Sequence, residues 1–146
     1  MNGQQTNSPV EFSQARDIKL SGISVKIIKG SDLKTIYGVV GEKTTVYEDL
    51  YGVNINIVSF QPENDHFSFD IVNETCWAFD LRGSTIDVNG IKVGDSINKI
   101  ENIFPESYQN RAKDYIFVDL IGTTHHLYIK FSPYTKVIER IIFFMD

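Results

Sequence analysis

Apolar and polar residues alternate in two short segments of the chain, and each segment contains a two-residue turn signal. Residues 86–93 alternate on both sides of Asn89-Gly90, and residues 18–25 alternate on both sides of Ser21-Gly22. Asn-Gly readily supplies the two positive φ angles of a type I′ hairpin turn, and Ser-Gly is a weaker form of the same signal. The pattern therefore predicts two equivalent β-hairpins.

A helical spacing of apolar residues follows each hairpin. The spacing predicts one helix over residues 31–40 and a second over residues 95–104. A serine or an aspartate stands at the start of each segment as a typical N-cap, and Gly41 and Pro105 are expected to end the helices. Because each helix is short and apolar on only one side, we expect it to pack on a sheet.

Strand-like alternation follows both predicted helices, and such alternation is typical of a sheet with one covered face. In the first half, the residues expected on the covered face are Val53, Ile55, Ile57, Phe67, Phe69, Ile71, Trp77, Phe79 and Leu81. In the second half they are Ile116, Val118, Leu120, Leu127, Ile129 and Phe131. Residues 137–144 are apolar on both faces apart from Glu139 and Arg140, so this strand is predicted to be central or covered by the other half.

The order of these elements indicates internal repetition. A shift of 64 positions aligns Gly30 with Gly94 and Ile36 with Ile100. The predicted fold class is α+β, with two similar hairpin-helix-antiparallel-strand units whose helices pack on one face of an antiparallel sheet. We expect a flexible N-terminal segment over 1–17 and a single domain over 18–146, with the two units at about 18–82 and 83–146.

Composition and charge narrow the class of protein. The 146 residues are 42% hydrophobic and 23% charged, as in ordinary globular domains. A formal net charge of -5 argues against nucleic acid as a partner, because phosphate binding needs an excess of Lys and Arg. No apolar stretch approaches the roughly 20 residues of a transmembrane helix. Cys76 is the single cysteine, so it cannot form an intramolecular disulfide, and its strand-like neighbours Trp77 and Phe79 suggest an inert, partly buried thiol.

The first nine residues are polar and lack the charged and apolar regions of a signal peptide. The protein is therefore expected either to be cytoplasmic or to have lost a signal peptide before Met1 was added for expression.

The segment from Ile91 to Pro105 reads Ile-x-Val-Gly-Asp-Ser-Ile-x-x-Ile-x-x-Ile-Phe-Pro. Together with the repeated hairpin, helix and strands, it resembles the β-lactamase-inhibitor-protein-like tandem repeat, and it is similar to the start of small envelope lipoproteins of the outer-membrane-assembly type. The resemblance covers most of the chain from Lys19 onward. It implies a sheet whose open face grips another protein, in the periplasm or at the cell surface of a bacterium, with a lipid anchor on the precursor as one option. The chain lacks the cysteine pair of the inhibitor itself, so a β-lactamase does not follow as the partner.

Candidate catalytic and metal-binding residues are few. His125 and His126 are neighbours in a predicted strand, so they point to opposite faces, and His66 lies in a polar loop. All three are therefore interpreted as exposed histidines, and neither a metal site nor a cofactor is predicted. Asp70 and Asp80 could face each other across two strands as an acid and base pair, but strand carboxylates are usually solvated. We therefore predict that the protein is not an enzyme.

One face of the second half combines aromatic and charged residues, as protein interfaces do. The predicted binding residues on this face are Tyr115, Phe117, Asp119, His126, Tyr128 and Lys130. The leading hypothesis is a non-enzymatic protein-binding or inhibitory module of the bacterial cell envelope, whose partner is another protein. The alternative is a small-molecule-binding or enzymatic α+β domain with a pocket between helix and sheet. A deep pocket with convergent polar groups would favour the alternative.

Overall fold

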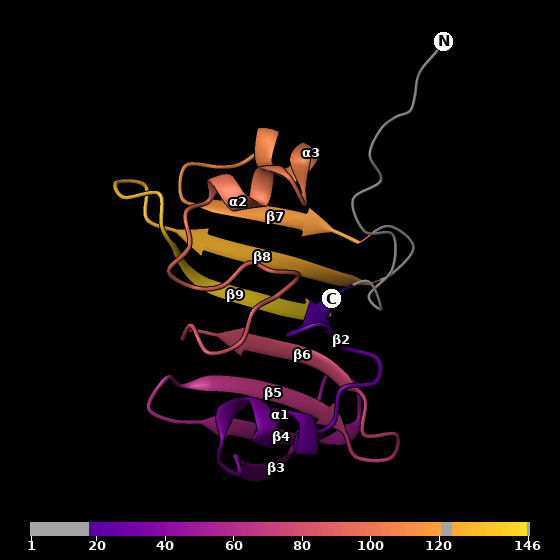
Figure 1. Cartoon of the computed structure of the whole chain (residues 1–146). Helices are drawn as coiled ribbons and strands as arrows, with labels where there is room; N and C mark the ends of the chain where they lie inside the picture. Colours follow the sequence, from indigo (N-terminus) through magenta and orange to yellow (C-terminus); the bar gives the residue numbers. More distant parts are fainter. Residues whose placement is uncertain (1–17, 121–123, 146) are drawn as a thin grey trace.

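The computed structural model describes residues 18–120 and 124–145, and it is dominated by one antiparallel sheet (Figure 1). Seven strands are hydrogen-bonded in the order β3-β4-β5-β6-β9-β8-β7, and a separate two-stranded sheet pairs β1 with β2. The strands are β1 (Lys19–Leu20), β2 (Ile23–Ser24), β3 (Glu42–Glu48), β4 (Val53–Phe60), β5 (Asp65–Asp70), β6 (Cys76–Leu81), β7 (Tyr115–Asp119), β8 (His125–Phe131) and β9 (Ile138–Met145). The helices are α1 (Gly30–Tyr37), α2 (Asn98–Glu101) and α3 (Pro105–Gln109).

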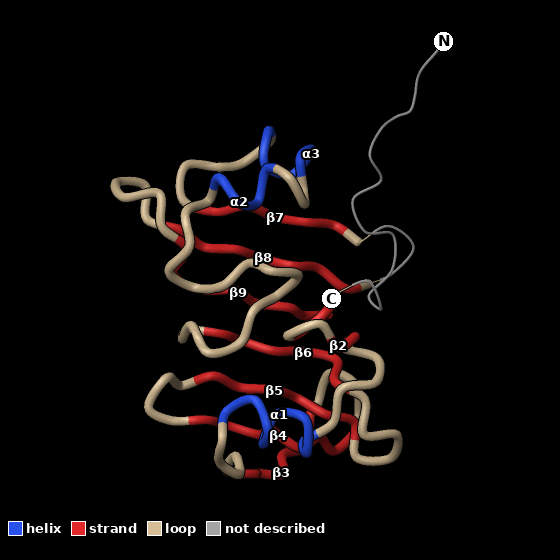
Figure 2. The backbone as a smooth tube through the Cα atoms, in the orientation of Figure 1, coloured by secondary structure: helices blue, strands red, loops and turns tan. Residues whose placement is uncertain are grey.

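The prediction of an α+β fold with two helices packed on the sheet is wrong. Strand makes up 44% and helix 14% of the structure, which is therefore mostly β. The helices are three short segments, and Figure 2 shows how little of the chain they occupy beside the strands and loops. None of these helices is long and apolar enough to cross a membrane.

The second predicted helix, over 95–104, is reduced to the four residues of α2 with turns on both sides, because its first residues pair with another segment. The amide of Ile97 donates to the carbonyl of Lys136, and the amide of Ile138 donates to the carbonyl of Asp95. Together with the antiparallel bridge between Ser96 and Val137, these bonds pair residues 95–97 with the start of β9, so the helix begins only at Asn98. Pro105, which was expected to end the helix, instead occupies the first turn of α3.

The first predicted helix forms, but it is shorter than predicted. α1 ends at Gly38, which adopts a left-handed conformation with a φ of 78°, rather than at Gly41. At its start, the carboxylate of Asp32 accepts the amide of Lys29 at 2.8 Å. Tyr37 then stacks on Phe60 with 4.0 Å between ring centroids, and this contact fixes the last turn of α1 over β4.

Both predicted hairpin turns are present. Ser21 and Gly22 have φ angles of 49° and 85°, and Asn89 and Gly90 have 54° and 88°, as a type I′ turn requires. The two hairpins also pair with each other, because Leu20 forms an antiparallel bridge with Val88. Most of their apolar residues are buried, and Ile23 and Val93 are partly buried, so the paired hairpins form part of the core.

The large sheet has two faces, which we call the inner face and the outer face. The inner face carries the fully buried side chains of the hydrophobic core and is covered by hairpins, turns and short helices. Of the core residues predicted by periodicity, Leu33, Ile55, Phe69, Phe79, Ile97, Ile100, Phe104, Val118 and Ile129 are buried, and Ile36 is only partly buried. The predicted flexible segment 1–17 lies outside the described residues.

The alternation assigned Ile55 and Ile57 of β4, and Trp77 of β6, to the wrong face, whereas Phe79 and Leu81 of β6 lie on the inner face as predicted. Ile57 pairs with Ser68, which places it on the outer face together with Ile55. Between β5 and β6, Ser68 pairs with Ala78 and the next residue, Phe69, pairs with Cys76. Trp77 is therefore left without a register partner, as the extra residue of a β-bulge in β6. A bulge shifts the alternation by one position, and Trp77 therefore lines the outer face although its spacing from Phe79 predicted the inner one.

Candidate functional site

The six predicted binding residues lie on neighbouring strands at one end of the sheet. β7 pairs with β8 in a register that matches Tyr115 with Lys130, Phe117 with Tyr128, and Asp119 with His126. The residues between them in sequence are buried on the inner face. All six side chains therefore share the outer face, as the alternation predicted.

The aromatic members of this set contact one another. Tyr115 stacks on Tyr128 with 5.3 Å between ring centroids, and Phe117 packs against His126 at 5.1 Å. Phe144, from the adjacent strand β9, extends the cluster by packing against His126 at 5.4 Å. Tyr115 and Phe117 nevertheless remain 40% and 41% exposed.

The charged groups on this part of the outer face are already paired with each other. The carboxylate of Asp119 lies 2.7 Å from Nδ1 of His126, and Nζ of Lys130 lies 3.4 Å from the carboxylate of Glu139. Further along the sheet, Arg140 donates two hydrogen bonds to Asp80, at 2.9 and 2.7 Å. This part of the face combines exposed rings with charges that have local partners.

Asp70 and Asp80 are not brought together as an acid and base pair. Asp80 is the register partner of His66 and binds Arg140. The carboxylate of Asp70 accepts the amides of Val72 and Asn73, which stabilise the turn after β5. Both carboxylates therefore have structural partners.

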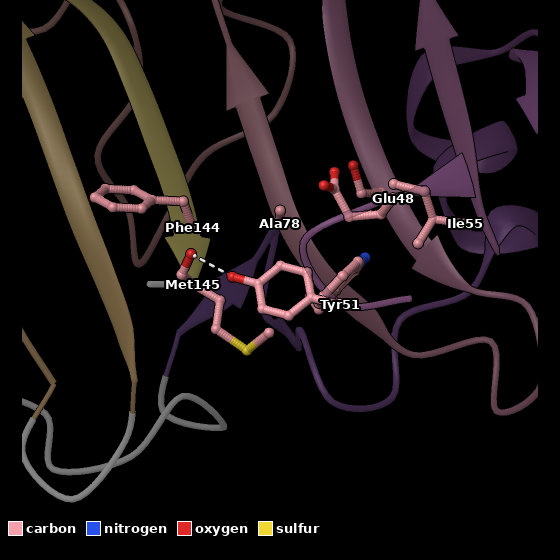
Figure 3. Close-up of a pocket in the computed structure, with 8 residues that line it drawn as sticks. Glu48, Tyr51, Ile55, Ala78, Phe144 and Met145 are labelled. Atoms are coloured by element: carbon pink, nitrogen blue, oxygen red, sulfur yellow. Dashed lines mark hydrogen bonds between the residues drawn. The ribbon is translucent and has the colours of Figure 1, made fainter. Parts of the chain in front are cut away.

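The centre of the outer face contains a recess of about 170 Å³ that sequence analysis did not identify. Tyr51, from the turn between β3 and β4, lies over it, and its hydroxyl donates to the carbonyl of Met145 at 3.2 Å (Figure 3). The same ring packs edge-on against Trp77 at 5.2 Å. The recess is lined by Glu48, Tyr51, Ile55, Ser68, Trp77, Ala78, Phe144 and Met145.

The recess exists because two small residues are register partners in the middle of the sheet. Ser68 and Ala78 face each other on β5 and β6, whereas the residues around them are large. Trp77 reaches the recess through the bulge, and its indole N–H is buried with no hydrogen-bond acceptor among the described residues. Unpaired buried donors are rare in folded proteins, and each one calls for an explanation.

The two neighbouring histidines point to opposite faces, as predicted, but neither is exposed. His125 is only 9% exposed and stacks on Phe143 with 4.8 Å between ring centroids. Burial lowers the pKa of His125, and the charge of Lys26 lowers it further. The interpretation of all three histidines as exposed is therefore wrong, because His125 is buried and His66 and His126 are partly buried. No group of three or more His, Cys, Asp and Glu gathers within residues 18–120 and 124–145.

Cys76 is buried in the inner-face core, as predicted for an inert thiol. Burial raises the pKa of the thiol to about 12, so at neutral pH it stays protonated and is a poor nucleophile.

Two further recesses lie beside α1, in the region where the alternative hypothesis requires a pocket. One of about 280 Å³ is lined by Gly30, Ser31, Lys34, Val40, Gly41, Lys43 and Val58, and one of about 200 Å³ by Gly30, Lys43, Asn56, Val58, Phe69, Ile71 and Glu74. Both are smaller than the roughly 300–1,000 Å³ of typical small-molecule sites.

No protein family matches the chain, and neither a curated protein sequence nor a solved structure shows significant similarity to it. The resemblance to the inhibitor-like repeat therefore remains a prediction.

Proposed function

We propose that the protein is a non-enzymatic binding module that recognises another protein through the outer face of β7 and β8. The contact residues are the six predicted from the sequence, which we call the aromatic surface: Tyr115, Phe117, Asp119, His126, Tyr128 and Lys130. The observation that carries the proposal is the exposure of Tyr115 and Phe117, two large rings held in a fixed cluster. Such rings provide much contact area and lose little conformational entropy on binding.

The arrangement of charges supports the same function. Burying an unpaired charge in an interface is unfavourable, whereas a charge that keeps a close partner is desolvated at lower cost. His126 has Asp119 beside it, and Lys130 has Glu139. A partner can therefore cover the rings without having to supply a counter-charge for every ionic group.

For the location, we propose the bacterial cell envelope, which the resemblance of the motif from Ile91 to Pro105 supports. Cell fractionation of the source organism tests this independently of binding. Recovery of the native protein in the periplasmic or membrane fraction is expected, and recovery in the cytosol alone would contradict the proposed location.

Site-specific photo-crosslinking in the source cells tests the proposed surface. A benzophenone side chain at position 117 is expected to capture one partner, whereas the same group at position 134 is not. Tyr134 is a suitable control because it is 90% exposed and lies in the turn between β8 and β9. Equal capture from both positions would indicate non-specific contact.

Purified partner then allows measurement of affinity. Replacing Phe117 or Tyr128 with alanine is expected to weaken binding roughly 5- to 1,000-fold, as for interface anchors worth about 1–4 kcal/mol. Tyr134→Ala should leave the affinity unchanged. A partner that binds both surface variants as tightly as the wild type would exclude the aromatic surface as the binding site.

A further inference from the structure

Three cationic side chains, which we call the basic row, lie across the outer face next to the aromatic surface. Lys130 and Arg140 are register partners on β8 and β9. Arg140 and Arg82, which follows β6, both approach the same carboxylate oxygen of Asp80, at 2.7 and 3.7 Å. Because neighbouring strands lie about 4.8 Å apart, the basic row spans roughly 10 Å. It begins at Lys130 of the aromatic surface and runs toward the centre of the sheet.

The carboxylates beside the basic row leave one positive charge without a counter-charge. Arg140 donates two hydrogen bonds to Asp80, at 2.9 and 2.7 Å, and thereby engages both carboxylate oxygens. Lys130 is paired with Glu139. The guanidinium of Arg82 lies 3.7 Å from Asp80 and donates no hydrogen bond within the part of the chain that the structure describes. Three cations therefore share two carboxylates.

This arrangement is unfavourable in the free protein. Lys130 and Arg140 are directly opposite each other, and like charges at such positions repel. Glu63, between β4 and β5, and Asp114, just before β7, form no ion pair with any of the three cations. The chain keeps this excess of positive charge although its formal net charge is -5. A bound anion would reduce the repulsion, and the side chain of Arg82, which is 45% exposed, is accessible to one.

The charges favour an anion that carries a single negative charge. One positive charge is unbalanced, and the carboxylates of Asp80 and Glu139 repel an anion of higher charge, such as a phosphate dianion. A carboxylate also matches the planar guanidinium of Arg82, which can donate two parallel hydrogen bonds to it. The basic row therefore fits one carboxylate.

The position of the basic row indicates where the carboxylate comes from. Ile142 is the register partner of Tyr128 on one side and of Asp80 on the other. A group that covers Tyr128 and Ile142 therefore lies next to the strand that leads to Arg82. In an extended chain, side chains two positions apart point the same way and lie roughly 7 Å apart. An apolar and an acidic residue with this spacing can contact the aromatic surface and Arg82 together.

We propose that the basic row binds one carboxylate of the partner protein, an aspartate or glutamate side chain two positions from an apolar residue on an extended segment. Arg82 binds this carboxylate, and the apolar residue covers Tyr128 and Ile142. The inference rests on the proposed function, because the aromatic surface brings the partner to this face. It adds the chemistry of the partner segment, and it extends the contact from β8 to the end of β6.

Two short peptides test this chemistry without the partner. Acetyl-Phe-Gly-Glu-amide carries a ring and a carboxylate at the proposed spacing, and acetyl-Phe-Gly-Gln-amide is its neutral counterpart. The chain has four arginines, so its ¹H–¹⁵N NMR spectrum contains few arginine Nε–H signals. The Glu peptide is expected to shift the Arg82 signal saturably, with a Kd of roughly 1–30 mM for so small a ligand. The Gln peptide should bind roughly 2- to 10-fold more weakly.

Three variants, followed through the Tyr128 signals, show whether Arg82 is the origin of this preference. Arg82→Gln is expected to bind the two peptides equally, because the free positive charge is gone. Arg82→Lys keeps the charge but not the two parallel hydrogen bonds, so it should retain part of the preference. Lys99→Gln removes an exposed cation of α2 whose partner is Asp95, and it should leave the preference unchanged.

Three results would overturn the inference. The first is equal binding of the Glu and Gln peptides to the wild type. The second is an unchanged preference in Arg82→Gln, because another cation would then hold the carboxylate. The third is a lower Kd for inorganic phosphate than for the Glu peptide at the Arg82 signal, because the basic row would then be a general anion site.

The purified partner separates failure of this contact from failure of the proposed function. Arg82→Glu is expected to weaken partner binding by at least about tenfold, whereas Lys99→Glu should leave it unchanged. Arg82→Gln gives the same answer with a smaller effect if the charge reversal impairs folding. If Tyr128→Ala weakens partner binding but neither Arg82 variant does, the aromatic surface stands and the carboxylate contact is excluded. If none of these variants weakens it, the proposed function fails, and the inference fails with it.

Discussion

Two pairs of aromatic rings on opposite faces of the sheet have almost the same geometry. On the inner face, Phe79 and Phe143 lie with ring centroids 5.2 Å apart and an interplanar angle of 24°. On the outer face, Tyr115 and Tyr128 lie 5.3 Å apart, also at 24°. The first two residues are direct register partners, whereas the second two are diagonal neighbours across β7 and β8.

The two pairs differ in what covers them. Phe79 and Phe143 are 2% and 0% exposed, whereas Tyr115 is 40% exposed. Strand spacing brings cross-strand side chains into contact on either face, so the ring geometry alone does not distinguish a structural pair from a binding pair. The layer that covers the rings distinguishes the two pairs, because the burial of apolar area is the dominant stabilising contribution. The same kind of contact therefore stabilises the fold on one face and is available for recognition on the other.

The largest effect is expected from truncating the inner pair. Phe79→Ala should lower the free energy of unfolding by about 3–5 kcal/mol, because it removes buried area and leaves a cavity that the core cannot fill. Chemical denaturation with an unchanged slope provides the measurement. A loss below about 1 kcal/mol would show that the inner face tolerates the change as a surface does.

A second comparison concerns two aspartates, one on each face. The carboxylate of Asp65 is fully buried and accepts the hydroxyl of Tyr37 at 2.6 Å, the amide of Arg82 at 2.7 Å and the amide of Gly83 at 2.9 Å. Burial, and then the bond to Asp65, raise the pKa of Tyr37 above its ordinary value. Asp80, on the outer face, is instead paired with Arg140 near solvent.

Asp65→Ala is therefore expected to destabilise the protein by roughly 2–4 kcal/mol, because it removes a buried carboxylate and leaves three partly buried donors without their acceptor. Asp80→Ala, the control on the outer face, should change stability by about 1 kcal/mol or less, as for partly exposed ion pairs. Denaturant titrations of the two variants under the same conditions test the difference. Equal losses would mean that the two faces do not differ in how they stabilise a charge.

The elements that sequence analysis predicted correctly depend on local chemistry. The turns at Ser21-Gly22 and Asn89-Gly90 require positive φ angles that those residues supply, so neighbouring residues suffice to predict them. The prediction of a helix over 95–104 was wrong because hydrogen bonds to residues 136–138, about forty positions away, determine the conformation of this segment. Such pairing is invisible to the periodicity of a single segment.

One part of the candidate site could be predicted from local sequence, and the other part could not. The alternation in β7 and β8 is unbroken, so it placed all six residues of the aromatic surface on one face. The recess was missed because its residues come from one turn and five strands, and because the bulge at Trp77 reverses the alternation. The useful signal was present, since Ser68 and Ala78 are small residues among large ones, but only the register shows that they face each other.

His125 is expected to make the stability of the fold depend on pH. His125, on the inner face, has a lowered pKa because burial disfavours its charged form. In the unfolded chain its pKa returns to about 6.5, so below that pH the unfolded state binds more protons than the folded state. Stability should therefore decrease as the pH falls from about 6.5 toward the folded pKa, and this contribution is absent above pH 7. In His125→Gln, the loss of stability between pH 7.5 and 5.5 should be smaller than in the wild type, and an equal loss would exclude His125 as its source.

The smallest effect on stability is expected on the outer face, from Tyr115→Ala. The substitution removes one ring of an exposed pair, so the lost aromatic contact is worth about 0.5–1.5 kcal/mol at most, and solvent exposure reduces this toward the lower end. Denaturation of this variant and of Phe79→Ala under the same conditions compares the free energy of unfolding that each ring pair contributes on its face of the sheet. If Tyr115→Ala is nearly neutral for stability but weakens partner binding tenfold or more, the outer pair serves recognition. If it destabilises the fold as much as Phe79→Ala does, the outer rings are structural, and the aromatic surface loses the observation that identified it.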